Sequence, residues 1–171
     1  MTTPEAGPNG LLGPDELSDR LDRLYCFHLM MVQWSLATAG RLAVSARQLL
    51  QTDLARDSRF HLESASRLAE RVTQLGGTVT ADPSDLPYRA PIDSIRMPNN
   101  LAGHHEVLIL LDKVTTSAIS AYLVLLDVIG DSDPVTQRII EDLLRASTIR
   151  LGDVRSASAI PPAPEQQETI Q

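Results

Sequence analysis

A proline-rich segment, residues 78–101, separates two pairs of helical stretches and limits the folds open to this chain. It contains Pro83, Pro87, Pro91 and Pro98. Because proline lacks a backbone donor and clashes with the preceding turn, no long helix can pass through it. A connection of more than twenty residues without regular structure is unusual, unless the chain must run the length of a helix bundle to join two parallel helices. The segment therefore favours an all-α bundle of four helices, with a long crossover between the second and the third.

Two long amphipathic helices are predicted before the crossover. The first runs from about residue 14 to about residue 45, and the second covers about 47–75. In both, apolar residues recur at the spacing of one helix face. Gly76 and Gly77 end the second helix, because glycine readily takes the left-handed conformation found after a helix C-terminus. The predicted inward stripe of the first helix consists of Leu17, Leu21, Leu24, His28, Met31, Val32, Leu36 and Ala39.

Two further helices are predicted after the crossover. The third, about 102–129, is apolar around much of its circumference, which predicts burial on two sides. The fourth begins at about Pro134, because proline suits the first turn of a helix, and runs to about Arg155.

The composition fits one cytoplasmic globular domain. With 171 residues and 43% hydrophobic content, the chain can bury a core without disulfides, and its single cysteine, Cys26, excludes an intramolecular one. We expect the bundle to span residues 15–155 between disordered tails at 1–14 and 156–171, which are rich in polar residues and proline. The start of the chain lacks a signal-peptide pattern. The longest apolar run, residues 118–129, is shorter than a bilayer requires, so no membrane span is expected.

Charge limits the expected partners. The formal net charge is −7, and the 15 basic residues are arginines spread along the chain except for Lys113. Proteins that bind nucleic acid directly use clusters of basic residues to neutralise phosphates. Direct DNA binding is therefore disfavoured, and a homo-oligomer or a protein partner is the expected association.

Three short motifs carry a resemblance to a known superfamily. They are AERVTQLGG at the end of the second helix, TVTADPSDLPYRAPID in the crossover and GDSDPVT before the last helix. Over residues 15–155 the chain resembles the ferritin-like superfamily, in particular its bacterioferritin and Dps-like branches. The resemblance implies a ferritin-like four-helix bundle, from a family whose members assemble and commonly handle iron.

The di-iron centre of a bacterioferritin is not complete in this sequence. Such a centre takes one carboxylate from each of the first and third helices, and a Glu-x-x-His pair from each of the second and fourth. The resemblance places these positions at His28, at His61 with Ser64, at Val114 or Thr115, and at Ser147 with Arg150. Every expected ligand is replaced, and Arg150 is the most telling replacement because a permanent cation opposes a nearby divalent ion. Standard ferroxidase activity is therefore not expected.

Two other sites of the family are also incomplete. The Asp-x-x-x-Glu pair that Dps-type sites use on the second helix is here Ser66-x-x-x-Glu70, so only Glu70 remains. Leu62 stands where a heme-binding methionine is expected. The HHE motif at 104–106 is a further polar cluster, which we interpret as surface because adjacent helical residues point in different directions. No cofactor, and in particular no heme, is expected.

The replaced positions leave two interpretations of the bundle centre. His28, His61 and Arg150 are expected to converge there, with Asp57 one helical turn from His61. In the first interpretation they form a polar core network, with Arg150 paired to Asp57 or to another acid. In the second they form a ligand site, which is either a cationic pocket for an anion or a nonstandard iron or zinc site. The candidate residues for this nonstandard site are His28, Asp57, His61, Glu70 and Arg150.

The leading functional hypothesis is a Dps/bacterioferritin-related protein that has lost the standard ferroxidase centre and acts as a self-assembling or partner-binding protein. The third helix, with its broad apolar face, is the expected assembly surface. One alternative is an iron-binding, iron-storage or DNA-protection protein with nonstandard ligands. Another is a small-molecule-binding or biosynthetic protein that uses the bundle centre.

Overall fold

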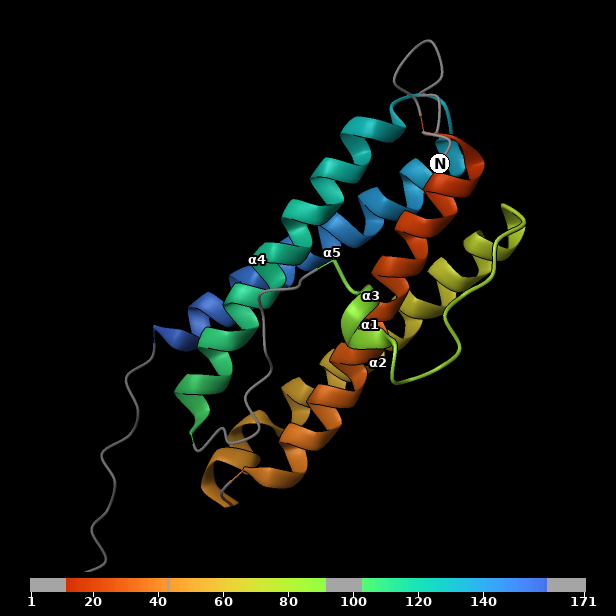
Figure 1. The fold of residues 1–171 in the computed structure, drawn as a ribbon. Coiled ribbons are helices and arrows are strands. Elements are labelled where there is room, and N and C mark those ends of the chain that lie inside the picture. Colours follow the sequence, from red (N-terminus) through yellow and green to blue (C-terminus); the bar gives the residue numbers. More distant parts are fainter. Residues whose placement is uncertain (1–11, 43, 92–102, 160–171) are drawn as a thin grey trace, which may run out of the picture.

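The computed structural model describes residues 12–42, 44–91 and 103–159, with the backbone alone at 44–49. Its long helices are α1 (Pro14–Arg41), α2 (Val44–Gln74), α4 (His104–Ile129) and α5 (Pro134–Ser158). Helices α1 and α2 form one antiparallel hairpin, and α4 and α5 form a second (Figure 1). Helices α2 and α4 run in the same direction (Figure 1), so the chain between them must return along the bundle. The predicted four-helix bundle with a long crossover is confirmed.

The helix ends differ from the predicted ones by a few residues. Helix α1 stops at Arg41 and α2 begins at Val44, so the first turn between helices comes earlier than predicted. Helix α5 continues to Ser158, beyond the predicted end at Arg155. The predicted disordered tails at 1–14 and 156–171 otherwise lie almost entirely outside the described residues.

Two glycines end α2 and let the chain turn against α1. Gly76 has a φ of 83°, a left-handed conformation that favours glycine. The backbone N–H groups of Gly76 and Gly77 donate to the carbonyls of Thr73 and Val72 at 3.0 and 2.9 Å. A side chain at Gly77 would collide with Ser18 of α1. The predicted stop is confirmed, and close packing against α1 is a second reason for glycine here.

Asp133 caps α5 and ties it to α2. Its carboxylate accepts the backbone N–H of Thr136 at 3.1 Å, and Arg71 of α2 pairs with it at 2.7 Å. Arg71 also donates to the Thr136 hydroxyl at 2.8 Å. These contacts hold the two hairpins together where α2 ends and α5 begins.

The crossover contains a short helix that the sequence analysis did not predict, α3 (Leu86–Arg89). Pro87 lies in its first turn, where a missing backbone donor costs little, so prolines that exclude a long helix still permit a short one. Asp22 of α1 holds the segment in place. Its carboxylate accepts two hydrogen bonds from Thr80 at 2.7 Å and pairs with Arg89 at 2.8 Å. The crossover is therefore attached to the first hairpin.

The core is built from aliphatic residues of all four long helices. Fully buried examples are Leu21, Leu50, Leu68, Val72, Ile129, Ile140 and Leu143. One predicted core residue is wrong, because Leu36 is 63% exposed whereas Ser35 and Thr38 are buried. The inward face of α1 continues from Met31 to Ser35 and Thr38 at helical spacing. The interior therefore becomes polar in the second half of α1.

Helix α4 is less buried than predicted. Ile109, Leu123 and Val124 are 42%, 52% and 61% exposed, so the predicted burial on two sides is wrong for this face within the bundle. By length and composition alone α4 could cross a membrane: an 18-residue window has a mean hydropathy of 1.6, and 44% of that window is buried. The apolar run on which the prediction rested, residues 118–129, is shorter than this 18-residue window and covers only the second half of α4. A core helix of a bundle meets the same criteria.

Candidate functional site

Two histidines meet in the interior of the bundle. His28 lies near the middle of α1 and His61 in the second half of α2. Their Nδ1 atoms are 2.8 Å apart, which is hydrogen-bonding distance. The ring of Phe27 approaches His28 edge-on and that of Phe60 approaches His61, each with 5.1 Å between ring centroids. Aromatic rings therefore shield a pair of imidazoles that is almost entirely buried.

Tyr122 of α4 extends this contact to the second hairpin. Its hydroxyl oxygen lies 2.9 Å from Nε2 of His28, and its side chain is fully buried. Burial raises the pKa of Tyr122, and a hydrogen bond with Ser147 of α5 acts in the opposite direction. The phenol is therefore protonated at neutral pH and can donate to His28.

Asp57 is the carboxylate of this site. It precedes His61 by one turn of α2 and is buried, and its Oδ2 accepts a hydrogen bond from Ser35 Oγ at 2.7 Å. Its Oδ1 pairs with Arg150 of α5 and lies 3.7 Å from Nε2 of His61. The guanidinium of Arg150 also lies over the ring of Phe60, 5.7 Å from its centroid. Groups from α1, α2 and α5 therefore surround this one carboxylate.

Both histidines are neutral. Burial lowers the pKa of His61 to about 3. Burial, together with His61 and Arg150, lowers the pKa of His28 well below its ordinary value. A neutral imidazole has one N–H and one acceptor nitrogen. In the arrangement that satisfies the Tyr122 hydroxyl and both Nδ1 atoms, Tyr122 donates to Nε2 of His28, and His28 donates to Nδ1 of His61. His61 then directs its remaining N–H towards Asp57.

Arg150 keeps its positive charge at this position. Burial lowers its pKa to about 10, while the nearby carboxylates of Asp53 and Asp153 act in the opposite direction. A pKa of about 10 leaves the guanidinium protonated at neutral pH. We call the connected residues Ser35, Asp57, His28, His61, Tyr122, Ser147 and Arg150 the central network, and it includes at least one residue from each long helix.

A family model for the ferritin-like domain matches residues 50–148. The chain belongs to the ferritin-like family. No curated protein matches it by sequence.

Solved structures share this ferritin-like fold at low sequence identity. A bacterioferritin-related protein of Bacteroides fragilis, described as a dodecameric thioferritin, is 18% identical with a TM-score of 0.77, covering 86% of each chain. The Dps protein of Vibrio cholerae O1 is 13% identical with a TM-score of 0.78, covering 91% of this chain and 99% of its own. DpsC of Streptomyces coelicolor is 18% identical with a TM-score of 0.68, covering 95% and 99%. The predicted relation to the bacterioferritin and Dps branches is confirmed at the level of the fold.

The ferritin-like fold brings several predicted site residues together. His28 and His61 are in contact, and Arg150 reaches them through Asp57. Ser147 is buried and contacts Tyr122. These residues belong to the central network described above.

Other predicted positions lie apart from the network. Ser64 is buried, but its hydroxyl donates to the carbonyl of Phe60 in its own helix at 2.7 Å. Val114 and Thr115 are buried about two turns before Tyr122 on α4. Glu70 is exposed and accepts a hydrogen bond from Gln74 at 3.3 Å. Leu62 is also exposed, at 55%.

The metal-ligating side chains do not form a cluster in the described part of the chain. Within residues 12–42, 44–91 and 103–159, no three His, Cys, Asp or Glu side chains gather closely enough to hold a metal ion. The HHE motif at 104–106 begins α4 with a half-buried His104, followed by exposed His105 and Glu106.

Sequence reasoning missed two members of the central network, Tyr122 and Ser35. Tyr122 lies in the third predicted helix, about 102–129, for which only the apolar character was considered, and its ring is buried. One general rule could have identified it: the hydroxyl of a buried tyrosine normally has a hydrogen-bond partner, so a polar group was to be expected beside it. Ser35 was not predicted because the more hydrophobic Leu36 beside it was assigned to the inward face. In the structure Ser35 is buried and Leu36 is exposed.

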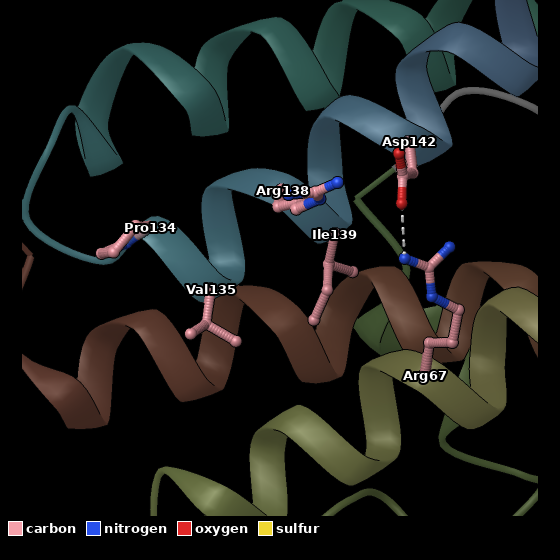
Figure 2. Close-up of a pocket in the computed structure, with 6 residues that line it drawn as sticks. All are labelled: Arg67, Pro134, Val135, Arg138, Ile139 and Asp142. Atoms are coloured by element: carbon pink, nitrogen blue, oxygen red, sulfur yellow. Dashed lines mark hydrogen bonds and ion pairs between the residues drawn. The ribbon is translucent and has the colours of Figure 1, made fainter.

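A shallow groove of about 360 Å³ lies between α2 and the start of α5. It is lined by Arg67, Pro134, Val135, Arg138, Ile139 and Asp142. Figure 2 shows Arg67 reaching Asp142 across the groove, with an ion pair of 2.8 Å. The groove is open to solvent, and no residue of the central network lines it.

Proposed function

We propose that this ferritin-like protein is a self-assembling subunit in which the central network stands in place of a di-iron centre. The observation that carries the proposal is the pairing of Arg150 with Asp57 in the bundle interior. Asp57 is the only carboxylate of the network, and a neighbouring cation already neutralises it. The bundle centre then serves to join helices.

The donor atoms of the network do not fit a di-iron carboxylate centre. Such a centre needs several carboxylates and two histidines. Here Asp57 is engaged by Ser35 and Arg150, and the two histidines use their Nδ1 atoms for each other. A divalent ion at this point would also be repelled by the guanidinium of Arg150.

The network has a clear structural use, because it connects the two hairpins. The bond between Tyr122 and His28 joins α4 to α1, and the ion pair between Arg150 and Asp57 joins α5 to α2. Removing one partner of such a buried pair leaves a charge uncompensated, so packings of the hairpins that separate the two groups are disfavoured. In this proposal the polar centre fixes the relative position of the hairpins.

Self-assembly is supported by the exposed apolar side chains of α4. Large exposed apolar patches in a folded protein are typical of contact surfaces. The bacterioferritin-related protein of Bacteroides fragilis, which has a similar fold, is a dodecamer. We extend to this chain only the property of forming a homo-oligomer.

The proposal is tested by iron oxidation. Ferrous iron is added in air to the protein and to buffer alone, and the appearance of ferric iron is followed by its absorbance. We expect the two rates to agree. A protein-dependent rate that saturates with iron would overturn the proposal and favour the alternative of an iron-handling protein with nonstandard ligands.

A further inference from the structure

The outward face of α4 has the residue spacing of a helix-packing seam. Lys113, Thr116, Ser120, Leu123 and Asp127 are all exposed, and they follow one another at steps of three and four residues. This spacing places the five side chains in one stripe along α4, which a second helix can contact along its length. Among the residues that the structure describes, no other helix buries these five side chains.

The apolar part of the seam lies in its second half. Leu123 is 52% exposed and Val124 is 61% exposed. Less than half of the most apolar window of α4 is buried by the rest of the chain. These two adjacent aliphatic side chains make this end of α4 the place where contact with another surface would bury the most apolar area.

The charges of the seam lie on either side of its centre. Lys113 and Asp127 are each seven residues from Ser120, and they are about 21 Å apart along the helix at 1.5 Å per residue. Neither has an ion-pair partner among the residues that the structure describes. Lys113 is also the one lysine of the chain. A cation and an anion at equal distances from one point are complementary under a two-fold rotation about that point.

We infer that a second copy of this chain packs antiparallel against α4, about a two-fold axis near Ser120. In this arrangement Lys113 of each copy faces Asp127 of the other, because a two-fold interface brings the same patch of both subunits together. Leu123 of each copy packs over Ser117 of the other. The inference rests on the proposed self-assembly and specifies the surface that carries it.

The centre of the seam allows the two helices to approach closely. Thr116, Ser117 and Ser120 have small side chains, and the distance between packed helices depends on side-chain size at the contact. The hydroxyls of Ser120 and Thr116 bond to α4 itself, Ser120 to the Thr116 carbonyl at 3.1 Å and Thr116 to Asp112 at 3.4 Å. They therefore bring no unpaired donor into the interface.

The pattern favours a second copy over a lipid surface. Lys113 and Asp127 would lose their hydration in a hydrocarbon layer, where charged groups are costly. In the antiparallel pair each charge gains an opposite one at the rim of the contact, where charged residues determine orientation.

Charge exchange tests this pairing in the full-length protein. The variants Lys113→Asp and Asp127→Lys each place like charges in contact, and we expect association in light scattering to weaken at least about tenfold. The double variant Lys113→Asp/Asp127→Lys exchanges the two charges and should restore association. Association unchanged in both single variants would overturn the α4 pairing while leaving self-assembly intact. A wild-type monomer at all concentrations would overturn self-assembly itself.

A crosslink tests the position of the axis without disturbing the charges. The variant Ser120→Cys places two thiols near the axis, and mild oxidation should give a disulfide-linked dimer. Ser66→Cys, exposed on α2, is the matched control and should remain uncrosslinked, while the native Cys26 is fully buried. Equal crosslinking of the two variants, or none with Ser120→Cys, would overturn the proposed axis. Circular dichroism confirms that each variant folds.

Discussion

The Nδ1 atoms of His28 and His61 lie 2.8 Å apart in the interior of the bundle. At this distance one ring must donate and the other accept, so the two imidazoles cannot both be protonated, and burial keeps both of them neutral. The resemblance to the family predicts iron-ligand positions of the first and second helices at these same two side chains. Their mutual hydrogen bond is the physical basis for interpreting the site as structural.

Acid should destabilise the protein through these histidines. Their folded-state pKa values are lowered, that of His61 to about 3 from an ordinary 6.5, so the unfolded chain binds more protons below pH 6.5. The stability that the two neutral histidines contribute is therefore fully present above about pH 7 and is lost as the pH falls from 6.5 towards 3. The slope of the free energy of unfolding against pH is at most about 1.4 kcal/mol per pH unit for each histidine.

Urea denaturation between pH 7.5 and 4.5 measures this slope. This range lies above the pKa values of Asp112, Asp133 and Asp142, which are lowered from 3.8 by their arginine partners and by hydrogen bonds, so the histidines dominate the change. The double variant His28→Phe/His61→Leu should show a flatter profile. A wild-type free energy of unfolding that stays constant from pH 7.5 to 4.5 would contradict the buried neutral pair.

Removing the Tyr122 hydroxyl should weaken the link between the hairpins. Tyr122→Phe keeps the ring but leaves Nε2 of His28 without its donor, which should lower the free energy of unfolding by about 1–2 kcal/mol. Chemical denaturation measures the change. Tyr88→Phe is the matched control, because Tyr88 is 83% exposed, and it should have no measurable effect. Equal effects of the two substitutions would show that Tyr122 is not part of the network.

The ion pair between Arg150 and Asp57 should show strong coupling. Arg150→Met leaves a buried carboxylate without its cation and should cost about 3–5 kcal/mol. The double variant Arg150→Met/Asp57→Leu should cost less than the sum of the two single variants. A double-mutant cycle by urea denaturation gives the coupling energy.

The exposed pair of Arg67 and Asp142 provides the comparison for this cycle. Its N···O distance is 2.8 Å, but both side chains are about two-fifths exposed. The corresponding cycle should give less than about 1 kcal/mol. Similar coupling energies in the two cycles would be inconsistent with burial of Arg150 and Asp57.

The crossover should loosen when Asp22 is removed. Asp22→Ala deletes the acceptor for the backbone N–H and hydroxyl of Thr80 and the buried partner of Arg89, at a cost of about 1–3 kcal/mol. Hydrogen exchange at the Thr80 amide should accelerate. Asp19→Ala removes only an exposed partner of Arg89 and should leave this amide protected. Unchanged exchange in Asp22→Ala would show that other contacts hold the crossover.

Much of the fold could be predicted from local chemistry. Proline restricts the backbone in the crossover and at Pro134, whereas glycine readily takes the left-handed conformation found at Gly76, so the consequences of these residues are visible in the sequence. Helix α3 was missed because its formation depends on burial of Leu86 and on the contact of Arg89 with α1. The exposure of Leu36 was missed for a related reason, since hydrophobicity alone does not identify which residue faces a polar centre.

The candidate site was less accessible to prediction. Helical spacing placed His28 and His61 on inward faces, and in the structure they touch. It could not identify Tyr122 as the third member, because the rotation of α4 relative to α1 is determined by packing between hairpins. The first interpretation paired Arg150 with Asp57 or with another acid, and the structure pairs it with Asp57, a choice that depends on the distance between α2 and α5.

The most direct test of the central claim is the iron content per subunit. The protein is loaded with ferrous iron under anaerobic conditions, loosely bound ions are removed, and elemental analysis is combined with light scattering on the same sample. The account predicts a defined oligomer with almost no iron, because Arg150 and the paired histidines occupy the bundle centre. About two irons per subunit, as in a di-iron centre, or many more inside a cage, would contradict it.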